Sequence, residues 1–124
     1  MDLVLALHNE TLALFGGTPG VRDPGSLEMA LNRPRNKKLY QPKTTLFGLA
    51  AAYCFGIVQN HPFLDGNKRA GAICAHSFLF LNGYEFRPNE ADYLATVLSV
   101  AQGKTEEDQL AAWIRENSAK RKPR

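Results

Sequence analysis

The chain has 124 residues, of which 44% are hydrophobic and 22% are charged. This balance predicts a packed globule rather than a disordered chain, and the length provides for one hydrophobic core and hence one domain. The longest apolar run, residues 70–81, falls short of the roughly 20 residues that a membrane-spanning helix needs, and the N-terminus carries no basic leader. We therefore expect a cytoplasmic protein with no membrane partner.

The formal net charge of +3 is concentrated at the C-terminus. Four of the last five residues are basic, and without them 11 basic residues stand against 12 acidic ones. Pro123 and the lack of large apolar anchors predict a disordered basic tail over residues 119–124, after a domain over residues 1–118. Because a charged tail alone is weak evidence for nucleic-acid binding, we expect a solvated chain end and no nucleic-acid partner.

Apolar residues recur at helical spacing almost throughout the chain, and no segment keeps the two-residue alternation of a half-buried strand. The sequence therefore predicts an all-α fold, a compact bundle of about six helices. The first helix covers residues 3–14 and ends at the glycines 16–17. A loop rich in proline and glycine follows over residues 18–25.

The second helix is expected to be short. Ser26 is a favourable N-cap, and Pro34 should end the helix soon after Leu31. Residues 36–45 are polar and include Pro42. They predict an exposed connection to the next helix.

Two strongly apolar helices come next. The first begins at residues 44–45, has one broad apolar face and ends at His61, where Pro62 stops it. The second covers residues 67–82 and is apolar almost all round, which predicts a buried central helix.

The last third of the chain predicts two more helices. Residues 84–88 form a connector that could pair as a short strand, and Asn89 caps a helix that runs through Ala101. Thr105 with Asp108 resembles a capping box, with Asp in the place of Glu or Gln. The residues that share one face of the final helix are Leu110, Trp113, Ile114 and Asn117.

The most informative segment is residues 61–69, which read His-Pro-Phe-Leu-Asp-Gly-Asn-Lys-Arg. Gly66 permits a sharp turn, and Asn67 is a favoured N-cap for the helix that follows. The free N–H groups at a helix start attract anions, while Lys68 supplies a point charge and Arg69 a planar fork for phosphate oxygens. The segment predicts a phosphate-binding site.

Two other side chains of this segment are suited to the chemistry at such a site. Asp65 could hold a Mg²⁺ ion whose other ligands are water and substrate phosphate. His61 is placed to take a proton from an attacking hydroxyl group. Phe63 is interpreted as an apolar anchor that fixes the middle of the loop.

The two cations also indicate a function, because they lie at a helix N-terminus. A helix N-terminus disfavours positive charge, so Lys68 and Arg69 carry a cost there unless an anion binds beside them. Such a conflict with a local rule is typical of a functional site.

The remaining cysteines and histidines are interpreted as structural. Cys54 and Cys74 lie in apolar helical segments and form neither a disulfide framework nor a plausible zinc set. We expect both to be small buried hydrophobic side chains. His8 and His76 lack an acid or thiol partner at metal-site spacing.

The 61–69 segment resembles the signature of the Fic superfamily, His-x-Phe-x-(Asp/Glu)-Gly-Asn-Gly-Arg-x-x-Arg. Two positions depart from it, because Lys68 replaces a glycine and Ala72 replaces the final arginine. Both departures resemble the Doc (death-on-curing) toxin branch, whose members read Asn-Lys-Arg here. The spacing of residues 7–17 and 20–28 is also similar to that of the N-terminal segments of Doc-like chains.

The resemblance implies a Fic/Doc-type helical bundle and a toxin-like protein kinase. ATP would be the donor, Mg²⁺ the metal, and a threonine of elongation factor Tu the acceptor, so that translation stops. His61 would be the base, Asp65 the metal ligand, and the 66–68 backbone with Lys68 and Arg69 the phosphate site. In the family, the segment matching 36–45 is a flap that contacts the target protein.

Control from outside the chain is also implied. Self-inhibited Fic proteins carry an inhibitory Ser/Thr-x-x-x-Glu-Gly/Asn helix, but Ala112 takes the hydroxyl position before Glu116 and Asn117 here. By resemblance, the inhibitor would be a Phd-like antitoxin.

Two alternatives stay open. Fic enzymes more commonly transfer AMP, and the same residues would serve that adenylyltransferase reaction with the nucleotide reversed. Gln59 stands where Doc-like chains often have a basic residue, and the missing cation could weaken nucleotide binding or allow a different nucleotide pose. An RNA-binding or nuclease toxin that uses the basic tail is the second alternative.

Overall fold

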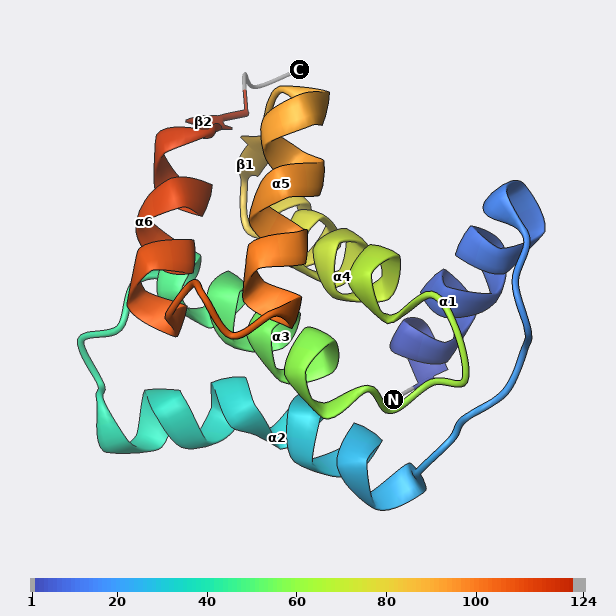
Figure 1. The fold of residues 1–124 in the computed structure, drawn as a ribbon. Coiled ribbons are helices and arrows are strands. Elements are labelled where there is room, and N and C mark those ends of the chain that lie inside the picture. The colour runs from blue at the N-terminus through green and yellow to red at the C-terminus, as the bar shows by residue number, and fades with distance from the viewer. Residues whose placement is uncertain (1, 122–124) are drawn as a thin grey trace.

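The structure, a computed structural model, describes residues 2–121. The helices are α1 (Asp2–Phe15), α2 (Pro24–Tyr40), α3 (Leu46–Asn60), α4 (Asn67–Leu81), α5 (Glu90–Ala101) and α6 (Glu107–Glu116), and the strands are β1 (Tyr84–Phe86) and β2 (Ser118–Lys120). The predicted all-α bundle of six helices is confirmed (Figure 1). None of the described helices has the length and apolar character needed to cross a membrane.

The centre of the bundle is shared by α3 and α4. Helix α3 packs against α2, α4, α5 and α6, while α4 also packs against α1 and β1. Figure 1 shows α2 along one side of this pair, with α5 and α6 on the other and α1 beside α4. The long apolar stretches at 46–58 and 70–79 account for this arrangement, because both helices must bury most of their surface.

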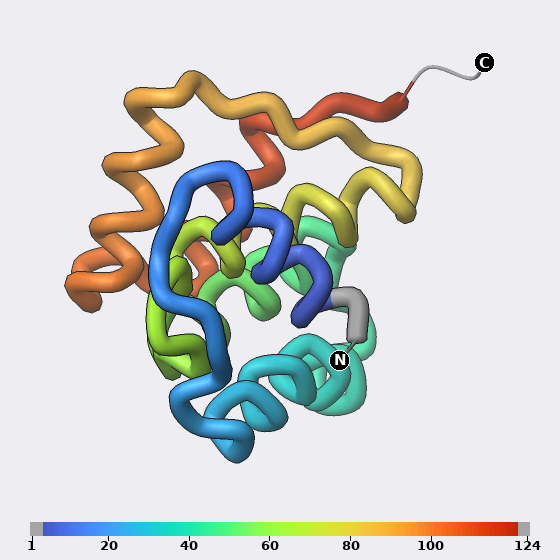
Figure 2. Tube along the Cα trace, turned by 90° about the vertical axis from the view of Figure 1, so that its right-hand side faces the viewer, coloured from blue at the N-terminus to red at the C-terminus, as the bar shows by residue number. Residues whose placement is uncertain are grey.

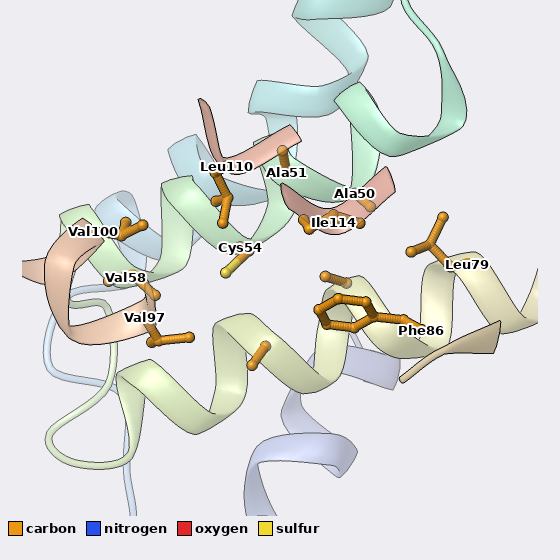
Figure 3. Close-up of a cluster of buried hydrophobic side chains, with 12 residues drawn as sticks. Ala50, Ala51, Cys54, Val58, Leu79, Phe86, Val97, Val100, Leu110 and Ile114 are labelled. Atoms are coloured by element: carbon orange, nitrogen blue, oxygen red, sulfur yellow. The ribbon is translucent and has the colours of Figure 1, made fainter. Parts of the chain in front are cut away.

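The hydrophobic core consists of two clusters. The larger lies among α3, α4, α5, α6 and β1 (Figure 3), and its buried residues are Ala50, Ala51, Cys54, Val58, Ala72, Ala75, Leu79, Phe86, Val97, Val100, Leu110 and Ile114. The smaller lies among α1, α2, α3, α4 and the loop before α4, and consists of Val4, Leu27, Ala30, Ile57, Phe63, Ala70 and Cys74. The second cluster reaches the 61–69 loop through Phe63.

The prediction of a short second helix is wrong. Helix α2 has 17 residues, begins after Asp23, whose carboxylate accepts N–H bonds from Gly25 and Ser26, and continues past the buried Pro34. Proline removes one helical hydrogen bond, but the close packing of α2 against α3 stabilises the helix and offsets this loss. A Cβ atom added to Gly56 would lie 3.2 Å from both Cα and the carbonyl oxygen of Ala30, so the two backbones almost touch.

The expected exposed connection over 36–45 is shorter than predicted, since its first half is helical. Only residues 41–45 connect α2 to α3. Glu107 of α6 explains part of the difference, because its carboxylate binds Arg33 Nε at 2.6 Å and Lys37 Nζ at 2.5 Å. These ion pairs fix the C-terminal half of α2 against α6.

The disordered tail predicted from residue 119 is wrong for residues 119–121. Ala119 and Lys120 lie in β2, which pairs antiparallel with β1 in the register Tyr84 to Lys120. The Arg121 guanidinium stacks 4.1 Å from the ring centre of Phe80. Residues 122–124 of the predicted tail lie outside the described residues.

The predicted strand over 84–88 is confirmed for residues 84–86, and Asn89 caps α5 as expected, accepting N–H bonds from residues 91 and 92. The cap of α6 differs from the prediction. It is Glu106, whose N–H donates to Gln109 Oε1 at 2.8 Å. Thr105 instead shares a hydrogen bond with Ser99 at 2.6 Å between hydroxyl oxygens.

Candidate active site

His61 occupies the end of α3 in an unusual backbone conformation. With φ 47° and ψ 54°, it is the one non-glycine residue among those described that has a positive φ. A β-carbon makes this left-handed conformation unfavourable, so the surrounding structure must impose it. The turn directs the chain away from α3 and leaves the imidazole exposed.

Arg22 holds this turn from a distant part of the chain. Its Nε donates to the carbonyl oxygen of His61 at 2.7 Å and its second guanidinium nitrogen to that of Asn60 at 2.9 Å. Its backbone N–H also donates to the carbonyl oxygen of Pro62 at 2.7 Å. The carbonyl groups at a helix end lack hydrogen-bond donors within the helix, and the Arg22 guanidinium supplies such donors here. The sequence motif gave Arg22 no role, because its partners lie 38–40 residues away.

Phe63 anchors the middle of the loop, as predicted. Only 1% of its surface is exposed. Its backbone forms an isolated antiparallel bridge with Val21, and the next N–H, that of Leu64, donates to Gly20 at 3.1 Å. Figure 2 shows the 16–23 segment running beside this loop.

Asn67 does not cap α4, contrary to the prediction. The N-cap is Gly66, in the left-handed conformation with φ 76°, and Asn67 is the first helical residue. The Asn67 side chain instead binds both backbone groups of Phe63: its Oδ1 accepts from N–H at 2.9 Å and its Nδ2 donates to the carbonyl oxygen at 3.0 Å. Glycine suits this cap because a residue with a β-carbon would be strained there. The Asn67 side chain is therefore available to bind Phe63.

The Asp65 carboxylate is exposed and held by two backbone groups. One oxygen accepts from Gly66 N–H at 2.8 Å and the other from Thr18 N–H at 3.2 Å. Gly17 makes room for it, since an added Cβ would lie 2.8 Å from Asp65 Oδ2 and Gly17 has φ 123°. Gly17 therefore does more than help to end α1.

This geometry fits a metal site with one protein ligand. Among residues 2–121, no group of three His, Cys, Asp or Glu side chains is arranged to hold a metal ion. Mg²⁺ is commonly bound through one or two carboxylates plus water and phosphate oxygens. A carboxylate has about four lone-pair sites, and the two N–H bonds leave Asp65 able to coordinate an ion.

Lys68 and Arg69 lie in the first turn of α4, and both side chains are exposed. The first helical hydrogen bond runs from Ala70 N–H to Gly66 O at 2.8 Å, so the N–H groups of residues 67–69 precede it. No acidic side chain of the described residues forms an ion pair with either cation. Arg69 instead stacks on Phe15 at the end of α1, 4.5 Å from the ring centre.

The Gln59 side chain contacts α5. Its side-chain amide donates to the carbonyl oxygen of Val100 in α5. The side chain at a position that is often basic in Doc-like chains thus helps to join α3 to α5.

The cysteines are buried, as predicted. Cys54 is 2% exposed and Cys74 5%. Burial raises the pKa of both thiols to about 12, so neither is a thiolate near neutral pH. His76 is exposed on α4, where it borders a hollow between α4 and the start of α5. His8 is buried under the 61–69 loop.

Comparison with known proteins found a matching family model and similar proteins. The Fic/DOC family model matches residues 1–79, which include α1 to α3, the loop and most of α4. Protein kinase doc of Escherichia phage P1 is 35% identical over 82 residues, which cover 66% of this chain and 65% of that protein. Toxin Doc of Mycolicibacterium smegmatis is 38% identical over 73 residues, covering 57% and 55%. In each match, the chain spans less than two thirds of the relative's length.

Proposed function

Because this chain belongs to the Fic/Doc family, with relatives of the Doc branch, we propose that it transfers the γ-phosphate of ATP to a hydroxyl group of a target protein. The observation that supports this most strongly is the composition of one short loop. Between the end of α3 and the first turn of α4 it carries an exposed imidazole, an exposed carboxylate and two cations that have no acidic partner among the described residues. The phage P1 relative is named a protein kinase, which favours phosphate as the transferred group.

His61 is the proposed general base. Its imidazole takes the proton of the acceptor hydroxyl while the oxygen forms a bond to the γ-phosphorus and the bond from that phosphorus to the bridging oxygen of ADP breaks. The strained, Arg22-bound turn holds the imidazole outside the core, where a protein substrate can reach it. A positioned base contributes about 10²–10⁴ in rate.

The phosphates are proposed to bind at the start of α4. The N–H groups of residues 67–69 and the positive end of the helix dipole favour an anion there, and Lys68 and Arg69 add two charges. Charge stabilisation and positioning supply most of the catalysis in phosphoryl transfer. Lys68, in place of a glycine, adds bulk and charge beside the backbone, and we propose that it selects which phosphate faces the acceptor.

Asp65 is the proposed ligand of Mg²⁺. When bound with ATP, the ion would neutralise charge on the phosphate oxygens. The chain's part is to keep the carboxylate in place through the N–H groups of Thr18 and Gly66. A change of Asp65 to Ala should weaken Mg²⁺-dependent ATP binding much more than it lowers stability.

The proposed biological role is that of a translation-blocking toxin in the cytoplasm, where ATP and the acceptor are found. The first acceptor to test is a threonine of elongation factor Tu. We further propose that a Phd-like antitoxin controls the activity, because Ala112 leaves α6 without the hydroxyl group of the inhibitory helix found in self-inhibited Fic proteins.

Mass spectrometry of purified elongation factor Tu tests the proposal. The factor is incubated with the protein, ATP and Mg²⁺, and the proposal predicts a threonine carrying phosphate. A threonine carrying AMP, which is far heavier, would make the chain an adenylyltransferase. Cleavage of RNA added to a parallel reaction, without any protein modification, would instead support a nuclease. The His61→Ala protein serves as the control and should leave the factor unmodified.

A further inference from the structure

His8 stands out among the buried residues of the chain. It is 2% exposed, and within residues 4–121, whose burial the structure describes, the only other buried polar or charged residue is Thr11, one turn further along α1. Buried polar side chains usually have a hydrogen-bonding role. His8 lies 53 positions before the 61–69 segment, yet both of its specific contacts are with that loop.

The two contacts hold the ring by its face and by one ring nitrogen. It stacks face to face on Phe63, with ring centres 3.7 Å apart and 9° between the planes. Its Nε2 lies 2.7 Å from the backbone carbonyl oxygen of Asp65. A carbonyl oxygen can only accept a hydrogen bond, so Nε2 carries the hydrogen in this contact.

The bond acts at the point where the loop turns into α4. The carbonyl group of Asp65 belongs to the peptide that joins Asp65 to Gly66, the N-cap of the helix. A Cβ atom added to Gly66 would lie 3.5 Å from His8 Nε2, so the ring also packs under this glycine. Rotation of this one peptide would move the Gly66 N–H that binds the Asp65 carboxylate, at the N-cap of α4.

We propose that His8 is a positioning residue for the phosphate and Mg²⁺ site. It acts through the Asp65–Gly66 peptide and touches no substrate. The inference rests on the proposed function, since it assigns His8 a purpose in binding ATP with Mg²⁺. Residues that orient a metal ligand in this indirect way commonly change affinity or activity by about 10–100-fold when mutated.

Two variants of His8 separate the hydrogen bond from the loss of the ring. His8→Gln and His8→Asn both remove the stacking on Phe63. Glutamine can place its amide nitrogen near the position of Nε2, whereas asparagine is too short to reach the carbonyl oxygen. Thr11→Val is the matched control, because it also removes a buried polar group from α1, and the Thr11 hydroxyl donates only to Leu7 O within the helix.

Calorimetric titration with ATP, with and without Mg²⁺, measures the effect. We expect His8→Asn to weaken Mg²⁺-dependent binding by about tenfold, His8→Gln to weaken it about threefold or less, and Thr11→Val to match the parent. When transfer is assayed, KM for ATP should rise in the same order while kcat changes little. Equal affinities for the Gln and Asn variants, or parental affinity in both, would overturn the proposal.

A second readout decides the case even if the parent binds no ATP. Backbone ¹⁵N relaxation should give lower order parameters at residues 64–66 in His8→Asn than in His8→Gln. Absence of ATP binding by the parent contradicts the proposed function, whereas unchanged loop order in His8→Asn contradicts the positioning role. The two failures are therefore distinguishable.

Discussion

The 61–69 loop and the larger core cluster are held in place by different interactions. In the cluster, apolar side chains from α3, α4, α5 and α6 exclude water from one another (Figure 3). In the loop, apart from the anchor Phe63, side chains hydrogen-bond to the backbone: Arg22 at His61 and His8 at Asp65 reach it from distant parts of the chain, and Asn67 binds Phe63 from within the segment.

The difference matters because the two regions should fail in different ways. Removing a core side chain lowers the free energy of unfolding through lost burial and a cavity. Removing a loop side chain loses one or two hydrogen bonds, each worth about 0.5–1.5 kcal/mol net, but shifts groups that must be aligned for catalysis. We expect activity to depend on the loop and stability on the core.

The largest effect on activity should come from His61→Ala. The exposed imidazole supports no core packing, so we expect transfer to fall by about 10²–10⁴ with little change in melting temperature. Growth arrest on expression measures activity, while circular dichroism and thermal melting measure folding and stability. A well-folded variant with full activity would remove His61 from the mechanism.

The largest effect on stability should come from Leu110→Ala. Leu110 is fully buried in the larger cluster, and the change should cost about 2–5 kcal/mol in urea unfolding. Leu94→Ala is the control, because Leu94 is 61% exposed on the neighbouring α5. KM for ATP should stay at the parental value while Leu110→Ala remains folded. A raised KM would show that loop and core are coupled.

Asn67→Ala should have a moderate effect on both stability and activity. Losing the two bonds to Phe63 should destabilise the chain by about 1–2 kcal/mol and raise KM for ATP. Asn82→Ala is a matched control at the other end of α4, where the amide donates only to Phe78 O at 2.8 Å. Chemical denaturation and steady-state kinetics compare the pair. If the two variants have the same KM, the Asn67 contacts do not order the phosphate site.

A smaller change is expected from Phe15→Ala. An exposed cation–π contact is worth about 0.5–1 kcal/mol, so loss of the Phe15 ring under Arg69 should raise KM for ATP about two- to fivefold. Leu14→Ala, which removes a neighbouring apolar side chain that is also exposed, should leave KM unchanged. Should Leu14→Ala raise KM as much as Phe15→Ala, the stacking on Arg69 would have no specific role.

The smallest expected effect is a pH dependence of the free energy of unfolding, and it arises at Glu107, away from the loop. Burial raises the pKa of Glu107, but hydrogen bonds from Lys37 and Arg33 outweigh it, so the pKa lies below its ordinary value. The stabilisation is therefore present above the ordinary carboxyl range and lost as pH falls through the folded pKa. Urea unfolding at pH 7 and in acid should show Glu107→Gln less stable than the parent only at the higher pH.

Asp108→Asn controls for loss of a negative charge in the same helical turn. It should differ from the parent by less than Glu107→Gln does at pH 7. A constant gap between the parent and Glu107→Gln at all pH values would show that the ion pairs do not titrate with folding.

The sequence predicted the helices better than their ends and contacts. Helical spacing located α3 to α5 well, because burial of an apolar face is a local pattern. It could not foresee that α2 continues through Pro34, since that depends on the packing of Ala30 against Gly56 from another helix. The order of residues 119–121 likewise depends on pairing with β1, whose sequence is more than 30 positions away.

For the site, the motif located the 61–69 loop but not its supports. The prediction that Asn67 caps α4 followed a general preference, whereas Gly66 takes that place and Asn67 binds Phe63. Arg22 and His8 carried no local signal, because a single arginine or histidine has meaning only once its distant partner is known. The roles of His61, Asp65, Lys68 and Arg69 in chemistry stay predictions.

The central claim is that this loop delivers the γ-phosphate of ATP to a protein. The most direct measurement incubates the protein and a cell extract with ATP labelled in the γ position or, in parallel, in the α position. We predict that a protein band becomes labelled from γ-labelled ATP alone and that His61→Ala abolishes the label. Label from the α position in the parent reaction would contradict the account and make AMP the transferred group.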